Sequence, residues 1–270
     1  MLILAATPIG NISDASERLK TTLASAKYIA AEDTRTLLQL ANHLGVKLAA
    51  ELISLHEHNE LQKLDRLVEI AKTADLVLVS DAGMPTISDP GFALVRACAD
   101  AGVEIQVVPG PSAVISALAV SGLSTDRFCF EGFLPRKSGE RTKVFESLLT
   151  ETRTMVFFES PHRISDSLSD AAKVFGPNRL ASVSRELTKK FEETKRGTLS
   201  ELIDWAQNLK GEMVLVIAGA EPVIWNLEDL VAQVVELKSS GTGLKQAASS
   251  VAKQYGASSS ELYALALKRL

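Results

Sequence analysis

Short apolar runs alternate with longer amphipathic stretches along the first half of the chain. Apolar runs bounded by turn residues are typical of buried strands, whereas apolar residues that recur every three or four positions indicate helices. The predicted strands are 2–6, 28–31, 76–80 and 104–108, and the predicted helices are 15–25, 34–44, 60–72, 92–101 and 112–120. This alternation predicts βαβ units and a largely parallel sheet.

A second set of α/β elements follows the polar, turn-rich segment 121–127. The predicted strands are 128–131, 154–158, 180–184, 192–198 and 213–218, and the predicted helices are 138–149, 162–175 and 199–209. Three further helices are predicted at 226–238, 244–255 and 259–270. The last two have the spacing of a helix-turn-helix, although a tail that packs on the second domain is the commoner outcome. The predicted parts are an N-terminal α/β domain over 1–120, a linker over 121–127, a C-terminal α/β domain over 128–222 and a helical extension over 223–270.

The composition narrows the class of protein. Hydrophobic residues make up 46% of the chain and charged residues 23%, which is typical of a soluble globular protein. No apolar run approaches the roughly 18 residues that a membrane-spanning helix needs, and the first residues lack the basic start of a signal peptide. Cys98 and Cys129 are too few for a disulfide framework or a zinc site. We therefore expect a cytoplasmic protein with no membrane partner and no metal.

Basic residues gather in the second predicted domain, although the net charge of the whole chain is −4. The overall charge argues against a protein that coats nucleic acid, but a local basic face can hold a polyanion. The candidate phosphate contacts are the basic residues around two predicted turns: Arg136, Lys137, Arg141, Lys143, His162 and Arg163.

Two loops rich in proline and glycine, 80–91 and 109–113, follow predicted strands. Loops at the carboxyl ends of parallel strands line the crevice in which ligands bind. Glycine-rich phosphate cradles, metal-ligand spacings and a serine nucleophile elbow are all missing from the sequence. A ligand held mainly by main-chain groups beside an acidic loop fits a nucleoside-like, zwitterionic cofactor such as S-adenosylmethionine.

At these loops the chain resembles the tetrapyrrole-methylase superfamily. Within that superfamily it is similar to the bacterial enzymes that methylate the 2′-hydroxyl of a cytidine in 16S rRNA. The stretches that carry the resemblance are ATPIGN at 6–11, AAEDTR at 30–35, HEHNE at 56–60, SDAGMPTISDPG at 80–91, VPGPSA at 108–113, SGLSTDRFCFEGFLPRK at 121–137, FFESPHRI at 157–164 and SRELTKKFEE at 184–193.

The resemblance implies that S-adenosylmethionine binds in a cleft between two α/β domains, within a homodimer. The first loop reads ATPIGN where the superfamily usually has G-x-G-x-G-D. That departure is shared by the rRNA-modifying branch and weakens the case for corrin or porphyrin precursors. The positions that the resemblance places at the cofactor are Ile9, Asp81, Gly83, Met84, Pro111, Ser112, Ala113, Phe158 and Ala218.

The resemblance also implies that the substrate is 16S rRNA within the small ribosomal subunit. Two alternatives stay open. The first is a methyltransferase of the same superfamily that acts on a small molecule such as a tetrapyrrole, or on a protein side chain. The second is a non-catalytic nucleic-acid-binding protein that uses its C-terminal helices.

Methyl transfer from a sulfonium to a ribose hydroxyl needs an in-line arrangement and a group that removes the proton or stabilises the alkoxide. The strand-exit motif 184–189 matches the superfamily, so Lys189, Glu186 and Arg185 are the favoured catalytic candidates. The other candidates are Glu32, Asp33, Glu159 and His162.

Overall fold

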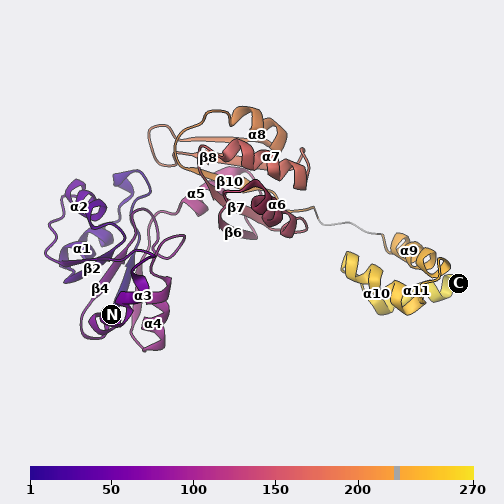
Figure 1. Ribbon diagram of the computed structural model, residues 1–270, viewed down its shortest axis with the longest axis horizontal. Helices are drawn as coiled ribbons and strands as arrows, with labels where there is room; N and C mark the ends of the chain where they lie inside the picture. The colour runs from indigo at the N-terminus through magenta and orange to yellow at the C-terminus, as the bar shows by residue number, and fades with distance from the viewer. Residues whose placement is uncertain (222–225) are drawn as a thin grey trace. The chain divides into compact units, whose positions relative to one another are not determined.

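The chain divides into two structural units, Met1–Ala220 and Glu221–Leu270 (Figure 1). The computed structural model describes residues 1–221 and 226–270. The first unit contains two five-stranded sheets, and the second unit contains three helices. The boundary predicted at 222–223 lies outside the described residues, and residues 226–270 of the predicted extension belong to the second unit.

The first sheet has the strand order β3-β2-β4-β1-β5, and every neighbouring pair is parallel. Its strands are β1 (Leu2–Ala5), β2 (Tyr28–Ala31), β3 (Glu51–Ser54), β4 (Leu76–Val79) and β5 (Ile105–Val108). The predicted parallel sheet is confirmed. Strand β3 was not predicted, because this edge strand is short and begins with an exposed glutamate.

Helices cover both faces of the first sheet, since alternate strand residues point to opposite faces. Helices α3 (Glu60–Thr73) and α4 (Phe92–Asp100) pack with Leu76 and Leu78 on one face. Helices α1 (Glu17–Ser25) and α2 (Thr34–His43) pack with Val77 and Val79 on the other face. A short 3₁₀ turn, η1 (Ile12–Asp14), precedes α1. All four residues of β4 are buried, as its unbroken apolar run requires.

The second sheet has the order β6-β7-β10-β8-β9 and is mixed, because only β6 and β7 are parallel. Its strands are β6 (Phe128–Phe133), β7 (Thr154–Glu159), β8 (Leu180–Arg185), β9 (Glu193–Thr198) and β10 (Met213–Ile217). One face packs against α6 (Ser138–Ser147), α7 (Ile164–Phe175) and α8 (Leu199–Trp205). The buried rings of Phe145 and Phe157 lie at the centre of this core.

Helix α5 (Ala113–Ser121) packs on the opposite face of the second sheet, which corrects the predicted domain boundary. Its Val114, Ala117 and Leu118 contact the sheet core, because this almost wholly apolar helix needs apolar cover. The chain therefore crosses from the first sheet to the second near 109–112. The segment predicted as a linker, 121–127, is instead the end of α5 and the turn that follows it, within the second domain.

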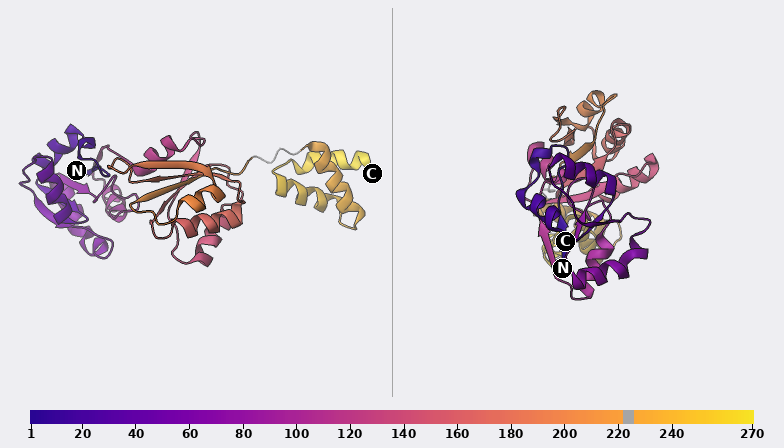
Figure 2. Two further views of the ribbon diagram at one scale, coloured as in Figure 1. Left: turned by 90° about the horizontal axis from the view of Figure 1, so that it is seen from above. Right: turned by 90° about the vertical axis from the view of Figure 1, so that its left-hand side faces the viewer.

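The second unit is a bundle of α9 (Leu227–Ser239), α10 (Leu244–Tyr255) and α11 (Ser259–Arg269), visible in two further views (Figure 2). Apolar residues of all three helices, including Leu230, Val251 and Leu262, form its own core. The side chains of Asn226 and Ser258 cap α9 and α11. Across residues 1–221 and 226–270, no helix is both long and apolar enough to cross a membrane.

Candidate functional site

A cavity of about 410 Å³ lies where the loops of the first sheet meet the second sheet. The loops after β1, β4 and β5 contribute Ile9, Ala82, Gly83, Met84, Ile87, Ser88, Asp89 and Ser112, and the first turn of α5 contributes Ala113 and Val114. The second domain contributes Phe133, Phe158, Glu159, Ser160, Pro161, Leu187, Gly211, Glu212, Met213 and Val214. The predicted strand-exit loops therefore do meet at one cavity, as expected for the carboxyl edge of a parallel sheet.

Main-chain hydrogen bonds hold the first-domain loops together. The Thr7 N–H donates to the Gly83 carbonyl at 2.9 Å, and the Gly83 N–H donates back to the Thr7 carbonyl at 3.2 Å. The buried Thr7 hydroxyl donates to the Ser80 carbonyl at 3.3 Å. The loops after β1 and β4 thus form one wall whose shape is set by the backbone.

Most of the predicted cofactor residues line this cavity. Six of them do so directly: Ile9, Gly83, Met84, Ser112, Ala113 and Phe158. The Pro111 carbonyl oxygen lies 3.8 Å from the position that a Cβ would take on Gly83, next to the lining. Asp81 is exposed beside the cavity, and its carboxylate accepts the Asp33 N–H at 3.2 Å.

The structure corrects the placement of Ala218. Strand β10 runs antiparallel to β7, so that Met213 pairs with Glu159 at the cavity end of the sheet. Ala218 follows the opposite end of β10, and its N–H donates to the Leu180 carbonyl. Met213 and Val214 take its place in the lining.

Asp89 is a cavity carboxylate that sequence reasoning missed. Burial raises the pKa of Asp89 to about 6, and the nearby charges of Glu32 and Asp81 add to this effect, while a hydrogen bond with Ser80 opposes it. Burial likewise raises the pKa of Glu32 and of Asp81. Above about pH 6 the ionised Asp89 carboxylate makes the first-domain side of the cavity attractive to a cation.

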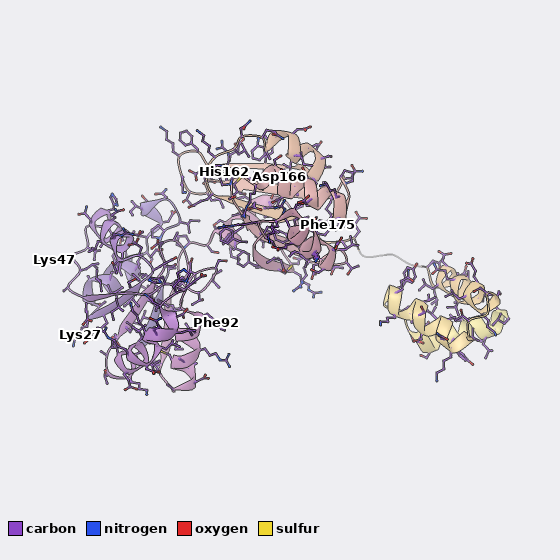
Figure 3. All side chains as sticks on the ribbon, viewed as in Figure 1. Lys27, Lys47, Phe92, His162, Asp166 and Phe175 are labelled. Atoms are coloured by element: carbon purple, nitrogen blue, oxygen red, sulfur yellow. The ribbon has the colours of Figure 1, made fainter. Side chains whose placement is uncertain are left out.

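Glu159 is fully buried at the end of β7 and holds Arg163 in place. Its carboxylate accepts hydrogen bonds from the Ser160 N–H at 2.7 Å, the Arg163 Nε at 2.9 Å and the Ser167 hydroxyl at 2.5 Å. His162 is exposed in the turn that leads into α7 (Figure 3). These contacts occupy the Glu159 carboxylate and hold the Arg163 guanidinium beside the end of β7.

Lys189 lies in a hydrogen-bonded turn after β8. Its ammonium is 3.0 Å from the Glu186 carboxylate and 2.9 Å from that of Glu212, a lining residue. Glu186 and Thr188 have positive φ values of 50° and 67°, and such strain is concentrated at functional sites. Arg185 pairs with Glu193 at 2.7 Å, and none of the three candidates Arg185, Glu186 and Lys189 is itself a lining residue.

The protonation state of Lys189 follows from these contacts. Burial lowers the pKa of Lys189, but hydrogen bonds to Glu212 and Glu186 outweigh burial and raise the pKa above its ordinary value. The side chain also crosses to the first domain, because a Cβ on Gly10 would lie 2.5 Å from the Lys189 Cγ. Lys189 is thus a fixed cation at the junction of both domains.

The predicted phosphate contacts differ in their exposure to solvent. Arg136, Lys137 and Lys143 are exposed. Arg141 is only 3% exposed, and its guanidinium lies 2.6 Å from the Asp170 carboxylate. Arg141 therefore belongs to the core of the second domain, which removes it from the candidate RNA contacts.

Comparisons with known proteins agree with this architecture. Residues 1–203 match the model of the Tetrapyrrole (Corrin/Porphyrin) Methylases family. The chain is 46% identical over 265 residues to "Ribosomal RNA small subunit methyltransferase I" of Mycobacterium tuberculosis (strain CDC 1551 / Oshkosh), covering 97% of this chain and 93% of that protein. The protein of the same name from Haemophilus influenzae (strain ATCC 51907 / DSM 11121 / KW20 / Rd) is 43% identical and covers 100% and 97%.

Two solved structures with other names share the fold. A diphthine synthase superposes with a TM-score of 0.60 at 16% identity, covering 81% of this chain and 90% of its own. A uroporphyrin-III C-methyltransferase from Thermus thermophilus, complexed with S-adenyl homocysteine, gives a TM-score of 0.55 at 15% identity, covering 80% and 96%. At these identities the likeness concerns the fold.

Proposed function

The chain belongs to the tetrapyrrole (corrin/porphyrin) methylase family, and from this premise we propose that it is an S-adenosylmethionine-dependent methyltransferase of small-subunit rRNA. The proposed acceptor is the ribose 2′-hydroxyl of a cytidine. The observation that carries the proposal is the cavity between the two α/β domains, lined by the loops that follow β1, β4 and β5.

The cavity fits S-adenosylmethionine in size and chemistry. Small-molecule sites commonly measure about 300–1,000 Å³ and are mainly apolar with a few placed polar groups. Here Ile9, Met84 and Phe158 supply apolar contact for a nucleoside, and the backbone of the β4 loop supplies polar groups. The ionised Asp89 carboxylate balances the positive charge of the sulfonium. The bound cofactor supplies a methyl group activated by the positively charged sulfur.

Lys189 is the residue that we assign to the acceptor oxygen. Methyl transfer forms an O–CH₃ bond, breaks the S–CH₃ bond and passes the hydroxyl proton to solvent water. Because the Lys189 ammonium stays protonated, it stabilises negative charge that develops on the oxygen rather than accepting the proton. Glu186 and Glu212 fix its position from two sides.

The proposed RNA contacts are the exposed cations of the second domain together with Arg163, which Glu159 holds in place. Arg136 and Lys137 follow β6, and His162 and Arg163 follow β7, so both pairs lie at strand ends next to cavity-lining residues. We further propose that the protein acts in the cytoplasm as a homodimer on rRNA within the small ribosomal subunit.

The direct test is transfer of a labelled methyl group from S-adenosylmethionine to three acceptors: small ribosomal subunits, free 16S rRNA and uroporphyrinogen III. We expect label in the 16S rRNA of the subunits, and mass spectrometry after nuclease digestion should identify a ribose-methylated cytidine. Label only in the tetrapyrrole, or in no acceptor, would refute the proposed substrate.

The affinity for S-adenosylmethionine should depend on pH through Asp89. With a pKa of about 6, Asp89 is mostly neutral at pH 5 and mostly ionised at pH 7. Ionisation favours a cationic ligand, so calorimetry should show the affinity rising by roughly tenfold between about pH 5 and about pH 7.

S-adenosylhomocysteine, which lacks the sulfonium charge, is the matched control and should show a much smaller change. In Asp89→Asn the ratio of the two affinities should become nearly independent of pH. A wild-type ratio that does not change with pH would show that Asp89 does not sense the sulfonium.

Binding of rRNA should weaken steeply with salt, because neutralised phosphates release counterions. Replacing both Arg136 and Lys137 with alanine should flatten the plot of log affinity against log salt by about 1 to 2 units of slope. Filter binding over a salt series measures this slope, with Lys20→Ala, a half-buried lysine of α1 outside the cavity lining, as the control. Equal slopes for the double variant and the wild type would place the RNA elsewhere.

A further inference from the structure

Three phenylalanine rings meet at the second-domain side of the cavity. The Phe158 ring lies between Phe130, with centroids 4.9 Å apart, and Phe133, with centroids 5.2 Å apart. Phe133 and Phe158 line the cavity, and Phe133 is 61% exposed although it is supported by this cluster. Phe133 therefore presents a large, exposed aromatic face at the rim of the cavity, and such a face is suited to contact with a ligand.

A β-bulge places Phe133 in this position. Side chains alternate along a regular strand, so residues three apart point to opposite faces. The pairing of β6 with β7 shifts between Phe130 and Phe133, and Gly132 adopts a φ of +72°. Glycine adopts this conformation without strain, and the resulting bulge brings both rings onto Phe158.

The chain that follows Phe133 connects the cavity to the exposed cations. The Leu134 N–H donates to the Phe158 carbonyl at 3.3 Å, and the Leu134 side chain is buried. The buried Arg141 guanidinium donates to the carbonyls of Pro135 and Arg136 at 3.3 and 3.4 Å. Phe133 therefore stands on a fixed segment between the cavity and the exposed Arg136 and Lys137.

We propose that Phe133 is the platform on which the base of the acceptor nucleotide stacks, an inference that rests on the proposed rRNA methyltransferase function. A nucleotide whose ribose enters the cavity must leave its stack, and an aromatic face replaces the contact that its base loses. The first-domain loops surround the other side of the cavity, whereas Phe133 adjoins the cations that would hold the neighbouring phosphates. Phe133 is thus a positioning residue for the acceptor.

The test compares Phe133→Ala, Phe133→Trp and Phe128→Ala with the wild type, using small ribosomal subunits and S-adenosylmethionine. Phe128 is an exposed phenylalanine at the other end of β6 and outside the cavity lining, so it serves as the matched control. We expect Phe133→Ala to lower kcat/KM by about 5- to 100-fold, the range for loss of one stacked base. Phe133→Trp should retain most of the activity, and Phe128→Ala should behave as wild type.

Calorimetry shows whether Phe133 acts on the acceptor or on the cofactor. The affinity of Phe133→Ala for S-adenosylmethionine should stay within about twofold of the wild-type affinity. In subunits reconstituted with rRNA that lacks only the acceptor base, Phe133→Ala and wild type should become equally slow. Circular dichroism reports whether each variant is folded.

Three results would overturn the inference while leaving the methyltransferase function intact. These are unchanged kcat/KM in folded Phe133→Ala, an equal loss in Phe128→Ala, and a loss of cofactor affinity that accounts for the whole effect. A wild-type protein that does not methylate the subunits would overturn both the inference and the proposed function.

Discussion

Replacing Lys189 with alanine should slow methyl transfer by about 10²- to 10⁴-fold, the usual consequence of losing a preorganised group that stabilises developing charge. The ammonium is held by Glu186 and Glu212 at 3.0 and 2.9 Å, so it is already in place before the reaction. Affinities for cofactor and RNA should change much less, because the interaction strengthens only in the transition state. Single-turnover transfer of labelled methyl groups to small ribosomal subunits measures the rate.

Two further variants test whether Lys189 acts through its charge or through proton transfer, and whether its position matters. Lys189→Arg should keep much of the rate, since the guanidinium is also a permanent cation. Gly10→Ala should lower the rate without removing the charge, because the new Cβ would lie 2.5 Å from the Lys189 Cγ and displace the side chain. Lys72→Ala, which removes an ion-paired lysine from α3, is the control. A near-normal rate in Lys189→Ala would exclude this role and direct attention to Glu186.

Replacing Arg141 with alanine should lower the free energy of unfolding by about 3–5 kcal/mol, the usual cost of leaving a buried charge without its partner. Asp170 is as buried as Arg141 and accepts two hydrogen bonds from the guanidinium, at 3.0 and 2.6 Å. Among the described residues, Ser138 and Lys173 would remain as hydrogen-bond donors to the Asp170 carboxylate. Urea unfolding followed by circular dichroism measures the loss.

An exposed ion pair provides the comparison for Arg141. Arg66 lies 2.7 Å from Glu51, with both side chains more than half exposed, so Arg66→Ala should cost less than about 1 kcal/mol. The double variant Arg141→Met/Asp170→Leu should recover much of the loss, since it removes both charges together. Equal, small losses in Arg141→Ala and Arg66→Ala would show that the buried pair does not stabilise the second domain.

Local sequence patterns were enough to predict most elements of the fold. The unbroken apolar run at 76–80 predicted a central buried strand, and β4 is buried at every residue. The three terminal helices begin and end within about a residue of their predictions, since Asn226 and Ser258 are strong caps and Gly256 ends α10. These signals act over a few residues, and tertiary contacts do not overrule them.

Tertiary packing decided which elements belong together. Helix α5 is apolar on nearly all sides, so its sequence does not reveal which sheet it covers, and the structure places it on the second sheet. The antiparallel direction of β10 moved the cavity end of that strand from Ala218 to Met213. Strand direction depends on pairing between distant segments, which a local pattern does not encode.

The candidate site likewise combines features that local sequence signals predict with features that arise from tertiary packing. Turn residues after apolar runs are a local signal, so the pattern predicted the loops 80–91 and 109–113, whereas the resemblance placed Ile9, Met84 and Ser112 at the cofactor. Only the tertiary structure could bring Asp89 beside Glu32, bury Arg141 against Asp170, and turn Phe133 onto Phe158 through a bulge. The sequence shows the residue types, but burial, charge pairing and side-chain direction depend on neighbours that folding brings together.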